Sequence, residues 1–175
     1  MRYCVRDAAL VLVSLLLLGG CAANVGVPQT RDAFVDRVRP GGPYRIAEHV
    51  TVNRPYEAVV ADLKECSGKC FDGRVMRPPN FRYKELGGWT TYHPKVEGSW
   101  RGVTTLSVQE EYGHPRANSG TPPGGLFVLV AEIRAAGEGR TRVDIYHVSR
   151  RHIADPLKRW IESGDRRCPP LDSAL

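Results

Sequence analysis

The sequence predicts an α+β fold: a curved antiparallel sheet with an N-terminal helix and a short C-terminal helix. Residues 45–52 alternate apolar and polar side chains, which is typical of a half-buried strand. Residues 53–65 have the 3.6-residue spacing of an amphipathic helix. Strand signals fill residues 71–149, and a second helical pattern over residues 155–163 follows them. The predicted order is therefore strand, helix, several strands and a closing helix.

The first helix is predicted to begin at Asn53, a favourable N-cap residue, with Pro55 in its first turn. Ser67 and Gly68 are expected to end it. Its apolar face consists of Tyr56, Val59, Val60, Leu63 and Cys66.

The clearest hairpin is predicted between residues 126–135 and 141–149, closed by Gly137-Glu138-Gly139. In its first arm, the alternation of a strand places Phe127 and Leu129 on the same face. The opposite face starts apolar and becomes charged. We therefore expect this arm to start buried on both sides and to end half exposed.

Further strand segments precede that hairpin. A second hairpin is expected between residues 81–86 and 89–96, with Gly87-Gly88 as its turn. Residues 99–112 predict a long strand that Gly102 interrupts. The loop of residues 113–125 is long for a hairpin connection, which leaves partner contact or ligand gating open as its role.

The closing helix is predicted to start at Asp155 as N-cap, with Pro156 in its first turn. Gly164 is a plausible residue to end it. Trp160 is the largest apolar side chain of this helix, and we expect it to dock the helix on the sheet.

The motif Val-Asn-Arg-Pro-Tyr-Glu-Ala-Val at residues 52–59 joins the first strand to the first helix. With the order of elements, it resembles the helix-grip superfamily, which includes START-type lipid-transfer domains and polyketide-cyclase-like domains, over about residues 44–165. The resemblance implies a sheet that wraps a long C-terminal helix around a cavity for an apolar ligand. Because the closing helix predicted here is short for that superfamily, a compact, filled version is expected at least as readily. Such domains also contact proteins in an envelope lipoprotein, so the resemblance allows either function.

The N-terminus carries an apolar run, residues 8–18, preceded by Arg2 and Arg6 and followed by Gly19-Gly20-Cys21. The run is about 11 residues long, which is shorter than the roughly 20 needed to cross a bilayer. This pattern resembles the signal peptide and lipobox of bacterial lipoproteins. An uncleaved membrane helix is the alternative.

The lipobox resemblance implies that residues 1–20 are removed and that Cys21 receives a palmitate-type lipid. Ala22 in the next position implies delivery to the outer membrane, facing the periplasm. Residues 21–43 are rich in glycine and proline and read as a lipidated tether. Residues 44–175 are then expected to form one α+β helix-grip-like domain.

Five cysteines are present. Cys4 leaves with the signal peptide and Cys21 carries lipid, so Cys66, Cys70 and Cys168 remain in a compartment where disulfides persist. Three thiols predict one bridge and one spare thiol, or an intermolecular link. Cys70–Cys168 is favoured, and Cys66–Cys168 is the alternative. Cys66–Cys70 ranks third because a regular helix does not readily bring i and i+4 into disulfide geometry.

The composition bears on partners and cofactors. The formal net charge of +6 comes mostly from scattered arginines. This argues against nucleic-acid binding, which needs a concentrated basic stripe, and favours anionic lipid headgroups or acidic envelope polymers. No zinc-ligand spacing is present, so no metal or cofactor is predicted.

No catalytic residues are predicted. The sequence lacks a G-x-S-x-G nucleophile elbow, and Glu110 and Glu111, adjacent on a strand, should point to opposite faces. His147 is expected inside as a hydrogen-bonded structural residue, with a ligand role as the alternative, and Trp89 is expected mainly in the core. The candidates for binding a ligand or partner are Trp89, Tyr92, His93, His114 and His147.

The sequence thus predicts a lipid-anchored, non-catalytic module that binds another envelope component, a protein or a polymer. The alternative is a carrier or sensor of a small apolar molecule. A carrier should have an apolar pocket of about 300 Å³ or more between the sheet and the C-terminal helix. A partner-binding module should have a filled interior and an exposed apolar patch.

Overall fold

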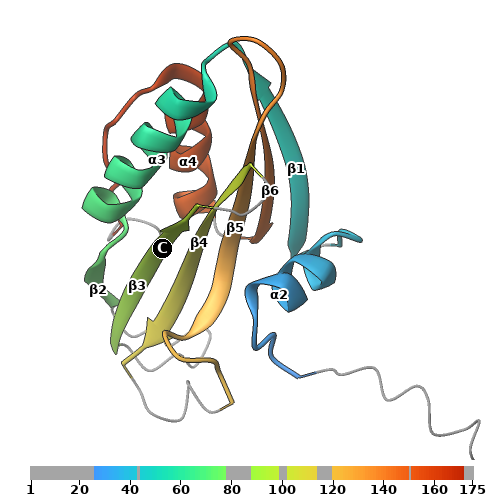
Figure 1. Cartoon of the computed structure of the whole chain (residues 1–175). Helices are drawn as coiled ribbons and strands as arrows, with labels where there is room; N and C mark the ends of the chain where they lie inside the picture. Colours follow the sequence, from blue (N-terminus) through green and yellow to red (C-terminus); the bar gives the residue numbers. More distant parts are fainter. Residues whose placement is uncertain are drawn as a thin grey trace, which may run out of the picture.

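The computed structural model describes residues 26–42, 44–77, 88–98, 102–113, 120–149 and 151–171. These form a six-stranded antiparallel sheet of order β1-β6-β5-β4-β3-β2. Two helices, α3 and α4, pack together on one face of this curved sheet, and α2 packs on the other (Figure 1). The predicted α+β fold class is confirmed. The expected signal peptide, Cys21 and His114 lie outside the described residues.

The elements follow the predicted order. The hairpin expected at residues 126–135 and 141–149 is present as β5 and β6. Gly164, at φ +67°, follows the closing helix as predicted. In chain order the elements are α2 (Arg31–Val38), β1 (Arg45–Val52), α3 (Tyr56–Cys70), β2 (Gly73–Arg77), β3 (Gly88–Glu97), β4 (Val103–Tyr112), β5 (Leu126–Ala135), β6 (Thr141–Val148) and α4 (Arg151–Ser163).

Both large helices are longer than predicted. α3 has Pro55 as its N-cap residue, without a side-chain cap, so the prediction of Asn53 at this position is wrong. α3 also continues through Ser67 and Gly68, because Cys66, Ser67 and Cys70 are buried and tertiary packing outweighs the low helix propensity of glycine.

α4 begins four residues before the predicted N-cap Asp155, which lies inside the helix. The buried residues Ile153 and Ala154 extend its apolar side toward the N-terminus. Pro156 also lies within the helix rather than in its first turn. The helix is therefore started by packing on the sheet and not by the local capping signal.

The prediction of a hairpin turn at Gly87-Gly88 is wrong. Gly88 is the first residue of β3 and pairs with Arg77, the last residue of β2. The partner of β3 is therefore β2, whereas the expected arm at residues 81–86 lies outside the described residues.

A β-bulge changes the faces of β5. Val108 pairs with Leu129, but Gln109 pairs with Phe127, so Val128 is an extra residue in β5. Phe127 is thereby turned toward α2, where its ring centroid lies 6.1 Å from that of Phe34. The prediction that Phe127 shares a face with Leu129 is wrong, because simple alternation does not allow for the bulge.

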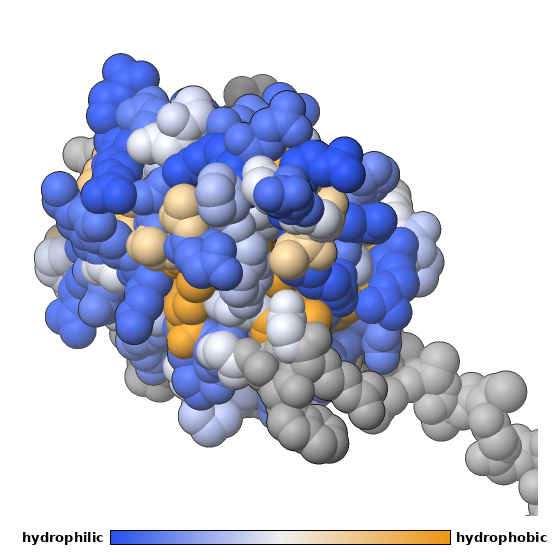
Figure 2. All heavy atoms as spheres, turned by 45° about the horizontal axis from the view of Figure 1, so that its top comes forward, coloured by the Kyte–Doolittle hydropathy of each residue, from blue (hydrophilic) through white to orange (hydrophobic). Residues whose placement is uncertain are grey.

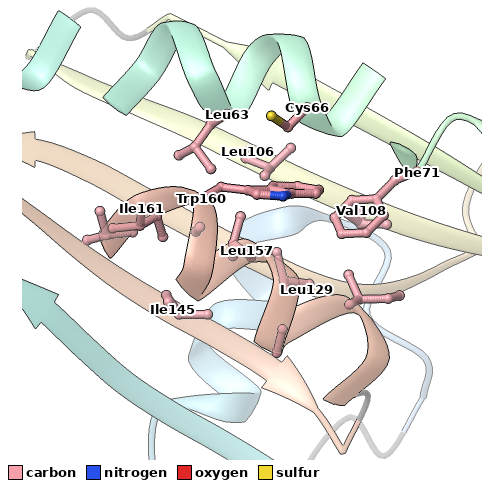
Figure 3. Close-up of a cluster of buried hydrophobic side chains, with 14 of the residues drawn as sticks. Leu63, Cys66, Phe71, Leu106, Val108, Leu129, Ile145, Leu157, Trp160 and Ile161 are labelled. Carbon is pink, nitrogen blue, oxygen red and sulfur yellow. The ribbon is translucent and has the colours of Figure 1, made fainter. Parts of the chain in front are cut away.

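The main core lies between the sheet and the helix pair α3 and α4 (Figure 3). Trp160 is fully buried, as predicted for the residue that docks α4. Its ring centroid lies 4.9 Å from that of Phe71, and its Nε1 donates to the Arg167 main-chain oxygen at 3.1 Å. Leu157 and Ile161 of α4 are also fully buried. Side chains therefore fill the space in which the family resemblance implies a ligand cavity.

A smaller core cluster lies beneath α2. Phe34, Val35 and Val38 of this helix are buried against Val130 and Tyr146 of the sheet. A helix of two turns needs such docking to be stable. The described part of the expected tether thus includes a packed helix, and the packed body of the chain includes residues before Tyr44.

The C-terminal segment is joined to α3 by a disulfide between Cys70 and Cys168. This is the pairing that the sequence favours. Cys66 is a free, buried thiol, and burial raises its pKa. The alternative bridge through Cys66 is therefore wrong.

A buried carboxylate adds a second connection at this end of the molecule. Asp62 of α3 pairs with Arg54 and with Arg166, and its side chain is 6 % exposed. Arg54 also donates to the Trp160 and Ile161 main-chain oxygens at 2.7 and 2.9 Å, where a cation is favourable at the C-terminal end of α4. Asp62 thus holds together α3, the end of α4 and the C-terminal segment.

We predict that this network makes the free energy of unfolding depend on pH in the acidic range. Burial on its own raises the pKa of Asp62, but the hydrogen bonds from Arg54 and Arg166 outweigh it and hold the pKa below its ordinary value of 3.8. The stabilisation is therefore present above that value and is lost as pH falls through the lower folded-state pKa. Asp62→Asn should lower the free energy of unfolding at pH 7, and its difference from wild type should narrow in acid. Urea unfolding across pH 2–7 measures both free energies of unfolding, and Asp36→Asn, at an exposed residue, is the control. A difference between wild type and Asp62→Asn that stays constant with pH would contradict the prediction.

Candidate functional site

The outer face of β2 and β3, opposite the main core, carries an exposed apolar pair. Trp89 is 44 % exposed and Met76 is 53 % exposed. They are directly paired in register, so their side chains share one face of the sheet. α2 packs on β5, β6 and β1 and leaves this pair uncovered. The prediction that Trp89 packs mainly in the core is wrong, because the pleat turns Thr90 and Tyr92 inward instead.

Charged side chains surround this pair. The Arg74 guanidinium lies 5.6 Å from the centroid of the Trp89 ring, within the range of a cation–π interaction. On the same face, His93 Nε2 lies 3.0 Å from Glu111 Oε2 of β4. We name Arg74, Met76, Trp89, His93 and Glu111 the β2–β3 surface. It combines one large flat ring, one flexible thioether and groups of both charges.

The other sequence-predicted candidates are not part of this surface. Tyr92 is 1 % exposed on the inner face, and its hydroxyl lies 3.0 Å from His152 Nε2. His147 is also buried, with Nε2 3.2 Å from Glu48 Oε1 and Nδ1 2.9 Å from the Val148 main-chain oxygen. It therefore has the hydrogen bonds expected of a structural histidine. Among the described candidates, Trp89 and His93 alone share the outer face of β3.

Sequence reasoning did not identify Met76 and Arg74. They join the surface only because β2 pairs with β3 across residues 78–87, at a register that places Met76 beside Trp89. The alternation of β2 alone gives the face of each residue but not its neighbour. No local signal in the sequence reveals that pairing.

A cleft of about 320 Å³ lies beneath α2. It is at the end of the sheet where the first residues of β5, Leu126–Val128, extend past the β5–β6 pairing that begins at Leu129 and His147. At the expected position, between the sheet and the C-terminal helix, the described side chains form the main core. The cleft is lined mainly by apolar side chains, among them Phe34, Val38, Phe127 and Val148. Three charged residues also line it: Arg37, Arg45 and Glu110.

The described residues place the two adjacent glutamates as predicted. Glu110 is fully buried and Glu111 is exposed, so they point to opposite faces and do not form a carboxylate pair. Within the described ranges, no group of three or more His, Cys, Asp or Glu side chains is arranged to hold a metal ion. Among the helices that the structure describes, none has the length and apolar character to span a bilayer.

Figure 2 shows a largely hydrophilic face on which apolar residues reach the surface only in small patches. A comparison of the chain with family models gives no match, and comparisons with curated proteins and with solved structures give no significant match.

Proposed function

We propose that this protein is a lipid-anchored lipoprotein of the bacterial envelope that binds another envelope component and catalyses no reaction. The N-terminal pattern that ends at Cys21 supports the anchor. A lipid on Cys21 holds the folded body at the membrane, with outer-membrane delivery expected from Ala22. The partner is a protein or polymer of the envelope.

The observation that carries the binding role is the exposed Trp89–Met76 pair beside a filled core. Large apolar side chains on a part of the sheet that α2 leaves uncovered favour contact with a partner. Trp and Arg are the residue types that most often dominate binding energy, and Trp89 and Arg74 lie together here. Met76 adds an adaptable apolar contact.

Photocrosslinking tests this role. We predict that p-benzoylphenylalanine at position 89 of the full-length chain, irradiated in the producing cells, gives one discrete adduct. Adding Met76→Ser should remove most of that adduct, because a central contact of such a surface is worth about 2 kcal/mol. The same probe at position 44 is the control, since Tyr44 is 74 % exposed at the opposite edge of the sheet. No adduct at position 89, or identical adducts from both positions, would contradict the proposal.

A second candidate function is supported by the cleft beneath α2. Its volume of about 320 Å³ falls in the range of small-molecule sites, which begin at about 300 Å³. In this case the protein carries or senses a small apolar molecule. Native mass spectrometry of the protein isolated from its host tests this: a co-purifying small molecule supports the candidate, and a clean apoprotein mass argues against it.

A further inference from the structure

We propose that the cleft beneath α2 binds one acyl chain of a single-chain anionic lipid taken from the membrane, with the headgroup at Arg37 and Arg45. This inference rests on the second candidate function and specifies its ligand. It places the site beneath α2, where Leu126–Val128 extend past the β5–β6 pairing.

The lining fits a hydrocarbon chain. Phe34 and Val38 of α2 pack with Phe127 of β5 and Val148 of β6 and give the cleft an apolar lining. The bulge at Val128 is what turns Phe127 toward this side. A volume of about 320 Å³ lies at the small end of ligand sites, which suits one chain better than a two-chain lipid.

The charges are separated along the cleft and give the ligand a direction. Arg45 Nη1 donates to the Arg37 main-chain oxygen at 3.4 Å, so both cationic residues lie at the β1 side. Arg45 is exposed and Arg37 half-buried, so a headgroup at this end keeps contact with water. Glu110 belongs to β4, which is separated from β1 by β5 and β6. An anionic headgroup is therefore attracted to the arginine end of the cleft.

The position of the cleft in the chain favours the membrane as the source of the lipid. Val27 and Pro28 line it, and Val27 lies six residues after Cys21. A stretch of this length spans at most about 20 Å. A lipid on Cys21 would thus hold the cleft close to the bilayer surface.

A photoactivatable fatty acid with a diazirine in its chain tests the site. The full-length protein in phospholipid vesicles is irradiated with this probe, and the labelled peptides are identified by mass spectrometry. We expect label in α2 and at the start of β5, removed by excess unlabelled palmitate. In the double variant Arg37→Gln with Arg45→Gln, the palmitate concentration needed to remove half of the label should rise about tenfold. The reason is the loss of charge-assisted hydrogen bonds to the headgroup. Arg39→Gln, at the C-cap of α2 and outside the cleft lining, is the matched control.

Three results would overturn the assignment. Label that unlabelled palmitate does not remove, or that lies outside the cleft, excludes a specific site there. Equal competition in the double variant and in Arg39→Gln excludes the headgroup position. The same labelling is done on Cys21→Ser, which cannot carry a lipid at this position. If label that palmitate removes is seen only in this variant, the protein's own acyl chain fills the cleft. A small molecule found by native mass spectrometry, together with any of these, would keep the second candidate function and reject only this ligand.

Discussion

Gly125→Ala is expected to destabilise the protein by about 3 kcal/mol or more, through overpacking and an unfavourable backbone conformation together. Gly125 has φ +91°, a region that other residues rarely adopt. A Cβ at this position would lie closer to the Glu110 main-chain oxygen than the sum of their van der Waals radii allows, and 2.8 Å from the Glu111 Cα. Both are backbone atoms of β4, which cannot move without disturbing the sheet.

Gly139→Ala is the matched control for that substitution. Gly139 also has a positive φ, of +65°, but a Cβ there meets nothing within 4 Å. The Gly139→Ala variant should therefore lose only about 1–2 kcal/mol of its free energy of unfolding, the cost of the unfavourable backbone conformation. Urea unfolding followed by circular dichroism gives both values, and equal losses in the two variants would show that the close approach to β4 is absent.

Cys168→Ala should lower the free energy of unfolding by about 2–5 kcal/mol under oxidising conditions. The bridge to Cys70 closes a sequence separation of 98 residues, and its loss frees the C-terminal segment that also supplies Arg166 to Asp62. In reductant, wild type and variant should unfold alike, because neither then has the bridge.

Cys66→Ala is the control for the loss of a thiol. Cys66 is not in the disulfide. Its variant should therefore show the same difference in unfolding temperature between oxidising and reducing conditions as wild type. Thermal unfolding with and without reductant measures all three proteins. A loss in Cys168→Ala that is the same in reductant would contradict a stabilising bridge.

Elements with strong local signals could be predicted from the sequence. The β5–β6 hairpin has two strand-forming segments around a glycine turn, and Trp160 is the largest apolar residue of its helix. For the disulfide, the poor geometry of an i, i+4 pair within a helix disfavours Cys66–Cys70. It leaves Cys70 and Cys66 as alternative partners of Cys168, of which the favoured Cys70 is the one in the structure. In these cases the local pattern and the tertiary packing agree.

The remaining features depend on contacts between distant segments. Phe127 changes face because of a bulge opposite Val108, which no periodicity of β5 reveals. α3 passes through Ser67 and Gly68 because its buried face continues to Cys70. Capping signals at Asn53 and Asp155 are therefore overridden by burial.

The candidate site was predictable in part for the same reason. Trp89 and His93 are recognisable as binding candidates by residue type, and alternation puts them on one face of β3. Whether that face is inside depends on which side α3 and α4 cover, and its neighbours depend on the pairing of β2 with β3. The cleft depends on the docking of α2, a segment that resembles a tether in composition.

Growth of the producing cells with radiolabelled palmitate tests most directly whether a lipid on Cys21 anchors this protein. We predict that the wild-type chain incorporates label and fractionates with the membrane. The Cys21→Ser chain should take up no label and remain either soluble or uncleaved. Absence of label from the wild-type protein, or a processed Cys21→Ser protein that stays on the membrane, would contradict the lipid anchor and with it the proposed place of binding.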